Sequence, residues 1–313
     1  MTRPSTTLVS IFFDIKKESD ASVASRPLEF YLENGRHMLS QPYPLILFCD
    51  PGLKPQIQAI RDEVCPANQT VYIEKNITDY EFYQQCKPII LKNREGDPQY
   101  IDHRNTASYC IVTNFKVHAM KIAYDLNPFH TTHFAWIDFG GGHICKNMSQ
   151  FLPEIMRSPK PGIAMLYITY RSAEEIQDRK RYMQGGPCGL AGNFWTIEAS
   201  CVDRLFLAFY EAFYGLLLEG VGHGDEQTFQ FVYHRFPEMF SLSYGDYGSV
   251  YSNYFYPRDD YHSIRWFYIQ QALNKGDRAA AKRAAEACCL SNKLETLSID
   301  QGEVRFLEGL GIS

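Results

Sequence analysis

The chain has 313 residues, of which 45% are apolar and 21% are charged, a composition typical of a soluble globular protein. The formal net charge is −5 and no long run of Lys or Arg is present, which argues against nucleic acid as a partner. The nine Cys include no CxxC pair, which argues against a structural zinc site and favours reduced thiols in a cytoplasmic or membrane-peripheral protein.

The first apolar run, at 6–15, is rich in β-branched and aromatic residues and predicts a buried strand. Its apolar core of about six residues is too short for a signal segment or a membrane span, so we expect no transmembrane segment here. Similar runs predict further strands at 43–52, 69–76, 132–138 and 162–171. Three- and four-residue apolar spacing predicts helices within 27–41, 54–64, 105–129, 191–220 (after a strand or turn) and 225–240.

This alternation of strands and helices predicts an α/β fold with a mainly parallel sheet flanked by helices on both faces. From Ser263 the chain becomes rich in Ala, and 263–288 predicts a helical hairpin with a Gly-Asp turn. We therefore expect one α/β domain over 1–255 and a helical C-terminal extension over 256–313, packed against it.

Three acids follow predicted strands. Asp14, Asp50 and Asp138 each end an apolar run, and ligands of open α/β sheets bind at the carboxyl ends of the strands. Each acid has a plainer interpretation as the cap of the following loop or helix. Asp138 differs because the glycines 140–142 follow it, and glycine permits positive φ and a close approach of the backbone to a ligand. The pattern favours a divalent metal that carries diphosphate oxygens.

Two further charged positions are candidates for the same site. Lys116 lies near the start of a predicted helix, from where its ammonium could face a diphosphate, or it is a solvated helix lysine. Asp225 and Glu226 follow a Gly-rich loop and open another predicted helix. Acids there offset the helix dipole, but two in succession also fit a catalytic carboxylate that deprotonates an acceptor hydroxyl or stabilises a positive sugar carbon.

Several motifs of the chain resemble those of one protein family. The stretch "NPFHTTHFAWIDFGG" resembles the "NPF…WIDxG" signature of the HtrL/YibB family, bacterial proteins regarded as glycosyltransferases. "SIFFDI", "GDEQTF" and "GDYGSVYSNY" also resemble that family, over roughly 7–256. More widely, the chain is similar to GT-A-type glycosyltransferases. The resemblance implies a GT-A-like fold over 1–255, a nucleotide-sugar donor, a divalent Mn²⁺ or Mg²⁺ ion, and a glycan or glycoconjugate acceptor.

The resemblance also implies roles for individual residues. Asp14 and Asp50 would bind the nucleotide, with Lys116, Gly140 and Gly141 on the diphosphate. Asp138 would hold the metal in place of a full DxD motif, whose second acid is replaced here by Gly140. With one acid, the metal is held together with another ligand, binds weakly or is not needed. A nitrogen of His143 or His262 would supply the other ligand, with His262 as our choice, and each also has a plainer interpretation as an ordinary surface or core histidine. By likeness to an "HDES" motif in related enzymes, Glu226 would be the reacting carboxylate and Asp225 would hold the acceptor or the donor sugar.

Two other classes fit the same residues. A nucleotidyltransferase would share the sheet and the metal acid but would make a nucleotide-sugar. A catalytically inactive carbohydrate-binding protein would keep the aromatic groove, consistent with 21 Tyr and 21 Phe. We expect a metal-dependent glycosyltransferase (hexosyl- or pentosyltransferase), although the sequence names no donor sugar, base, acceptor, stereochemical outcome or oligomeric state.

Overall fold

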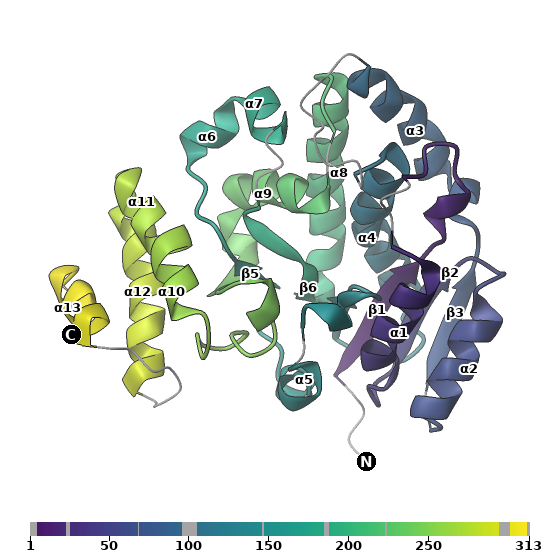
Figure 1. Cartoon of the computed structure of the whole chain (residues 1–313), viewed down its shortest axis with the longest axis horizontal. Helices are drawn as coiled ribbons and strands as arrows, with labels where there is room; N and C mark the ends of the chain where they lie inside the picture. Colours follow the sequence, from purple (N-terminus) through teal and green to yellow (C-terminus); the bar gives the residue numbers. More distant parts are fainter. Residues whose placement is uncertain are drawn as a thin grey trace.

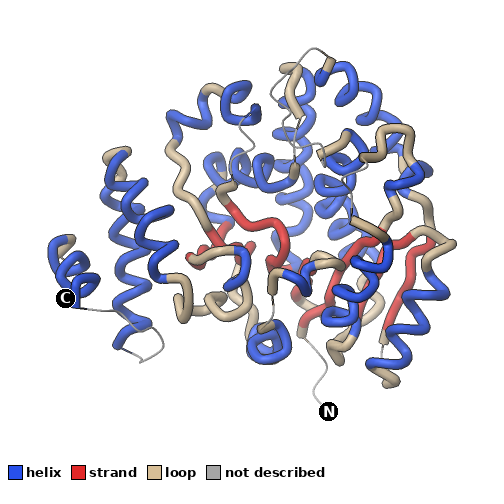
Figure 2. Tube along the Cα trace, viewed as in Figure 1, coloured by secondary structure: helices blue, strands red, loops and turns tan. Residues whose placement is uncertain are grey.

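A single mixed sheet organises the computed structural model, which describes residues 5–22, 26–67, 69–95, 105–145, 147–184, 188–222, 224–293 and 301–311. The strands of this sheet are β1 (Thr6–Phe12), β2 (Leu45–Cys49), β3 (Thr70–Glu74), β4 (His133–Ile137), β5 (Ile163–Tyr167), β6 (Leu190–Glu198) and β7 (Phe240–Tyr244). Their order is β3-β2-β1-β4-β6-β5-β7, and Figures 1 and 2 show the strands gathered in one sheet with helices packed around it.

The pairing confirms the predicted α/β fold class with a mainly parallel sheet. Strands β1 to β4 pair in parallel, and β5 pairs in parallel with β7. Strand β6 runs antiparallel to both of its neighbours, β4 and β5. The start of β6 therefore lies at the same edge of the sheet as the carboxyl ends of β1, β2, β4, β5 and β7.

Helices cover both faces of the sheet, as predicted. The longer ones are α1 (Leu28–Leu39), α2 (Lys54–Val64), α3 (Glu81–Arg94), α4 (Ala107–Leu126), α5 (Met148–Arg157), α8 (Val202–Leu218), α9 (Asp225–Arg235), α12 (Arg278–Lys293) and α13 (Gln301–Gly309). The shorter ones are α6 (Ala173–Gln177), α7 (Arg179–Gln184), α10 (Tyr261–Ser263) and α11 (Gln270–Asn274). Local apolar patterns did not predict α3, α5, α6, α7 or β7.

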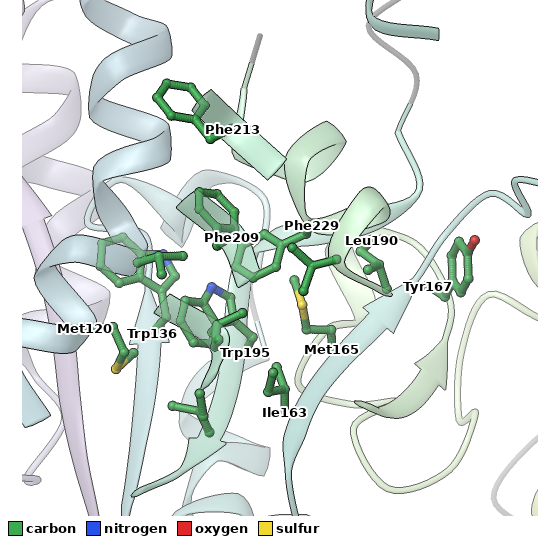
Figure 3. Close-up of a cluster of buried hydrophobic side chains, with 14 of the residues drawn as sticks. Met120, Trp136, Ile163, Met165, Tyr167, Leu190, Trp195, Phe209, Phe213 and Phe229 are labelled. Carbon is green, nitrogen blue, oxygen red and sulfur yellow. The ribbon is translucent and has the colours of Figure 1, made fainter. Parts of the chain in front are cut away.

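The strands carry apolar side chains on both faces, so the sheet has two cores. Side chains of α1, α2 and α5 pack on one face, and side chains of α3, α4, α8 and α9 pack on the other. In the second core, Trp136 of β4 stacks on Trp195 of β6, which packs in turn against Phe229 of α9 (Figure 3). This aromatic layer fixes α9 over the middle of the sheet, below the edge where β4 ends and β6 begins.

The C-terminal helices lie on the side of the molecule opposite α2 (Figure 1). A π-helical segment, η7 (Ile264–Ile269), joins α10 to α11, and its Ile264 and Tyr268 belong to the same core as α4 and α9. The backbone oxygen of Phe267 accepts a hydrogen bond from the amide of Tyr170, in the loop after β5. This core therefore contains side chains from both sides of residue 256. The division of the chain into a domain over 1–255 and an extension over 256–313 stays a prediction.

Among the described helices, none combines the length and apolar character needed to cross a bilayer. All nine Cys lie in the described part of the chain, where none of them forms a disulfide.

Candidate functional site

The buried ammonium of Lys116 brings together two acids and one backbone oxygen at the carboxyl edge of the sheet. Its Nζ lies 3.0 Å from Oδ1 of Asp138 and 3.0 Å from Oδ2 of Asp225. It also donates a hydrogen bond of 3.0 Å to the backbone oxygen of Gly192. The three partners come from the end of β4, the start of α9 and the start of β6, so one side chain joins three segments that are distant in sequence.

The position of Lys116 differs from the prediction. Thr106 caps α4 by accepting a hydrogen bond from the amide of Tyr109, so the helix begins at Ala107 and Lys116 lies in its middle. Its side chain is buried between α4 and the sheet. The lysine therefore pairs with carboxylates in the interior, and does not point from a helix start toward solvent.

Asp138 follows β4 and is held by its neighbours. Successive residues of a strand point to opposite faces, so Asp138 continues the face of Trp136, two residues earlier. The indole Nε1 of Trp136 donates a 2.7 Å hydrogen bond to Oδ1 of Asp138. The amide of Asp138 donates to the backbone oxygen of Asn193 on β6. With its side chain 35% exposed, Asp138 is both fixed by the core and open to solvent.

The two acids at the start of α9 have different partners. Asp225 is 3% exposed and pairs with Lys116, whereas Glu226 is partly buried. Glu226 accepts a hydrogen bond of 2.9 Å at Oε1 from the amide of Gly192. At Oε2 it accepts a hydrogen bond from the phenol of Tyr247. Residues adjacent in a helix point about 100° apart, which explains how neighbours reach separate partners.

Gly192 is required at the centre of this arrangement. A Cβ built at this position would lie 2.3 Å from Oδ2 of Asp225 and 3.1 Å from Cγ of Glu226. Neither acid can withdraw easily, because Asp225 is bound to Lys116 and Glu226 is bound to Tyr247. Only glycine lets α9 approach β6 closely enough for both acids to reach the edge.

The charges of the cluster change one another's pKa values. Burial alone would lower the pKa of Lys116, but Asp138 and Asp225 hold it above its usual value, so the ammonium stays charged. Burial raises the pKa of Asp225, and Lys116 opposes that effect. Burial and then the charge of Asp225 raise the pKa of Glu226 to about 7, against the opposing bonds from Tyr247 and Gly192.

The glycines after Asp138 differ in how closely they pack, and the diphosphate-binding role of Gly140 and Gly141 stays a prediction. Gly140, Gly141 and Gly142 are all described, and none has a positive φ. A Cβ at Gly140 would lie 2.7 Å from the ring of Tyr31, and one at Gly142 would lie 2.4 Å from the ring of His37. These two glycines thus permit the loop to pack against α1. Only Gly141 faces open space, where an added Cβ would meet nothing nearer than Cβ of Asp138, at 3.9 Å.

Asp14 and Asp50 lie at the same edge, after β1 and β2, and both interact with the backbone. The carboxylate of Asp14 accepts a hydrogen bond from the amide of Lys16 and lies 3.5 Å from the ammonium of Lys17. Asp50 is buried and accepts a 2.7 Å hydrogen bond from the amide of Asp14, and burial raises its pKa. The two acids thus stabilise the loops after β1 and β2, and their nucleotide-binding role stays a prediction.

The candidate histidines do not join the cluster. His262 is exposed on α10, where its ring packs against Trp266. His143 uses both ring nitrogens, since Nδ1 lies 2.7 Å from the backbone oxygen of Gly140 and Nε2 lies 2.6 Å from the guanidinium of Arg26. In the described part of the chain, no group of three or more His, Cys, Asp or Glu is arranged to hold a metal ion. The metal set of Asp138 and His262 therefore stays a prediction.

The sequence analysis missed Trp136, Gly192 and Tyr247 as members of the site. Trp136 and Tyr247 lie within stretches that carried a resemblance, "NPFHTTHFAWIDFGG" and "GDYGSVYSNY". Gly192 and Tyr247 contact Glu226, which lies 34 and 21 positions away, so no local pattern marks these two residues. Trp136 bonds to Asp138 only two positions later, a spacing that places both on one face of a strand and could have indicated the contact.

Comparison with known proteins identifies relatives of the chain. The model of the HtrL_YibB family, described as a bacterial protein of unknown function, matches residues 4–255. Protein HtrL of Escherichia coli strain K12 is 24% identical over 269 residues, which cover 77% of this chain and 88% of that protein.

Solved structures also match about three quarters of this chain. Mouse xyloside xylosyltransferase 1, in its apo form, is 12% identical with a TM-score of 0.42, over 76% of this chain and 84% of that one. Core-mannan synthase A of Aspergillus fumigatus, in an Mn/GDP form, is 10% identical with a TM-score of 0.45, over 77% of this chain and 73% of that one.

We predict that Lys116→Met lowers the free energy of unfolding by about 3–5 kcal/mol, because it leaves the buried carboxylate of Asp225 and the partly exposed carboxylate of Asp138 without their counter-charge. Lys121→Met is the matched control, since Lys121 lies on the same helix and also pairs with two acids, Asp125 and Asp203, but at the surface. Its loss should be about 0–1 kcal/mol. Urea denaturation measures both, and equal losses in the two variants would contradict a structural role for the buried ammonium.

Proposed function

We propose that this chain, which belongs to the HtrL_YibB family of bacterial proteins of unknown function, is a glycosyltransferase. It would move a sugar from a nucleotide-sugar to a hydroxyl group of a glycan acceptor. The observation that supports this most is the cluster of Lys116, Asp138, Asp225 and Glu226 at the carboxyl edge of the sheet. Ligands of open α/β sheets bind at this edge, and buried charges with perturbed pKa values are typical of functional sites.

We assign Asp138 to the diphosphate of the donor. Its Oδ1 accepts the bonds from Trp136 and Lys116, so Oδ2 is the atom that we assign to a ligand. Mg²⁺ and Mn²⁺ are usually held by one or two carboxylates together with phosphate oxygens and water. Asp138 fits that pattern as one protein ligand, with the remaining ligands from the diphosphate and water. When bound, the ion would neutralise charge on the departing diphosphate.

The nucleotide would lie over the ends of β1 and β2, beside Asp14 and Asp50. Two observations support this placement. Strand β1 is the direct neighbour of β4, so the loop that contains Asp14 lies next to the strand that ends at Asp138. There is room for a side chain at Gly141, so the backbone after Asp138 is not packed tightly there. Gly140, which is packed against Tyr31, would contribute its backbone groups only.

Glu226 is the carboxylate that we assign to the reaction. Its pKa of about 7 suits a general base, which works best near the pH of the medium. Glu226 would accept the proton of the acceptor hydroxyl as that oxygen attacks the sugar carbon. Asp225 is bound to Lys116, so its proposed part is to hold a sugar hydroxyl near the edge of the cluster.

We predict that Glu226→Gln reduces kcat by at least 100-fold with little change in the donor KM, because the amide accepts no proton in the transition state. In the wild type, kcat should fall as the pH drops through about 7, since only the ionised carboxylate is a base. Asp225→Asn removes a partner of Lys116, so it should lower Tm and raise KM more than it lowers kcat.

Glu81→Gln is the matched control for these variants. Glu81 is also an acid in the first turn of a helix, α3, but it is exposed. Its variant should keep normal rates. Near-normal rates in Glu226→Gln as well would mean that Asp225 and Glu226 only stabilise the start of α9. The main support for catalysis at this site would then be lost.

The activity itself is tested with a panel of UDP-, GDP- and CMP-sugars, by measuring release of nucleotide with and without Mn²⁺ or Mg²⁺. We expect slow donor hydrolysis with at least one donor, and a loss of more than tenfold in Asp138→Ala. Because this variant loses a partner of Lys116, its Tm should fall, so its rate is measured at a temperature where it stays folded. Release of pyrophosphate from a nucleoside triphosphate and a sugar phosphate would instead identify a nucleotidyltransferase. Neither reaction would be seen with a protein that only binds carbohydrate.

A further inference from the structure

The carboxylate of Glu226 is held at both oxygens. The amide of Gly192 donates to Oε1 over 2.9 Å, and the phenol of Tyr247 donates to Oε2 over 2.5 Å. Charge-assisted hydrogen bonds of this kind are short and strong. Two donors on separate elements, β6 and the turn η6 (Tyr247–Ser249), set the plane of the carboxylate as well as its position. A glutamate with only one of them would be free to rotate about that single bond.

Tyr247 is itself fixed by the segments around the site. Its backbone oxygen faces the thiol of Cys145 at 3.2 Å and the side-chain amide of Asn193 at 3.5 Å. Its amide donates to the carboxylate of Asp246, which forms a capping box with Ser249. Cys145 ends the loop that follows Asp138, and Asn193 accepts the amide of Asp138 on its backbone oxygen. Tyr247 thus connects Glu226 to the same two segments that hold Asp138.

The phenol of Tyr247 is a hydrogen-bond donor throughout the neutral range. Burial and then the charge of Glu226 raise the pKa of Tyr247 above its usual value, so the phenol keeps its proton. The thiol of Cys188 lies in the same group, beside Tyr247 and Glu226, and burial and Glu226 raise its pKa also. Because the phenol keeps its proton, Tyr247 is the donor and Glu226 the acceptor of the hydrogen bond between them.

We propose that Tyr247 is the positioning residue of Glu226, which it holds in the orientation needed to take a proton from the acceptor hydroxyl. The proposal rests on the glycosyltransferase function proposed above, and it adds a residue that acts through Glu226. Reacting groups must be held within a fraction of an ångström of the productive geometry. A hydrogen bond that sets the carboxylate plane therefore affects the rate more than it affects the affinity for the donor.

The test compares Tyr247→Phe with Tyr254→Phe. Tyr254 lies seven positions later and also has a buried, hydrogen-bonded phenol, whose partners are Thr196 and the amide of Lys160. We expect Tyr247→Phe to lower kcat about 10- to 100-fold, the effect of losing one hydrogen bond to a charged group, with donor KM within about twofold. Tyr254→Phe should lower Tm and leave kcat normal.

A thermal-unfolding cycle tests the contact without any activity. Tyr247→Phe should lower Tm in the wild-type background and have much less effect in a Glu226→Ala background, because its partner is then absent. Equal Tm shifts in both backgrounds, or a normal kcat in Tyr247→Phe, would overturn this inference alone. Absence of turnover by the wild type with every donor would instead overturn the proposed function, and the positioning role with it.

Discussion

The arrangement of the site depends on one buried ammonium. Lys116 has little contact with water, and an unpaired charge in such a place would cost several kcal/mol. It is satisfied by Asp138, Asp225 and the backbone oxygen of Gly192. The carboxylates of Asp138 and Asp225 in turn need the lysine, because it supplies their positive counter-charge. The end of β4, the start of α9 and the start of β6 must therefore meet where α4 places this side chain.

The rest of the site follows from that constraint. With Asp225 bound inward, its neighbour Glu226 is turned toward Gly192 and Tyr247. The approach of α9 to β6 requires a residue without a side chain at position 192. The aromatic layer below, with Trp136 and Trp195, supports the cluster, and the indole of Trp136 reaches up to Asp138. The hydrophobic core and the charged edge are in this way parts of one structure.

Local patterns in the sequence are sufficient to predict β1 to β5, most of the longer helices and the acids at the strand ends, but not β7. Asp138 is marked by the apolar strand before it, and Asp225 and Glu226 by the glycine loop before them. The partners of Lys116 are not predictable in this way, since they are set by how α4 lies across the sheet. The positive φ expected of the glycines after Asp138 is absent, and packing against Tyr31 and His37 explains the lack of a side chain at Gly140 and Gly142 but not at Gly141. The antiparallel direction of β6 depends on long-range pairing and has no local signal.

The central claim, that the edge beside Asp138 receives the diphosphate of a nucleotide-sugar, is tested most directly by a crystal structure with UDP or GDP bound. The account predicts that the diphosphate oxygens lie beside Asp138, at the carboxyl ends of β1 and β4, while Lys116 stays between Asp138 and Asp225. A nucleotide bound at the opposite edge of the sheet would contradict the account, as would a Lys116 that leaves both carboxylates to hold the phosphates.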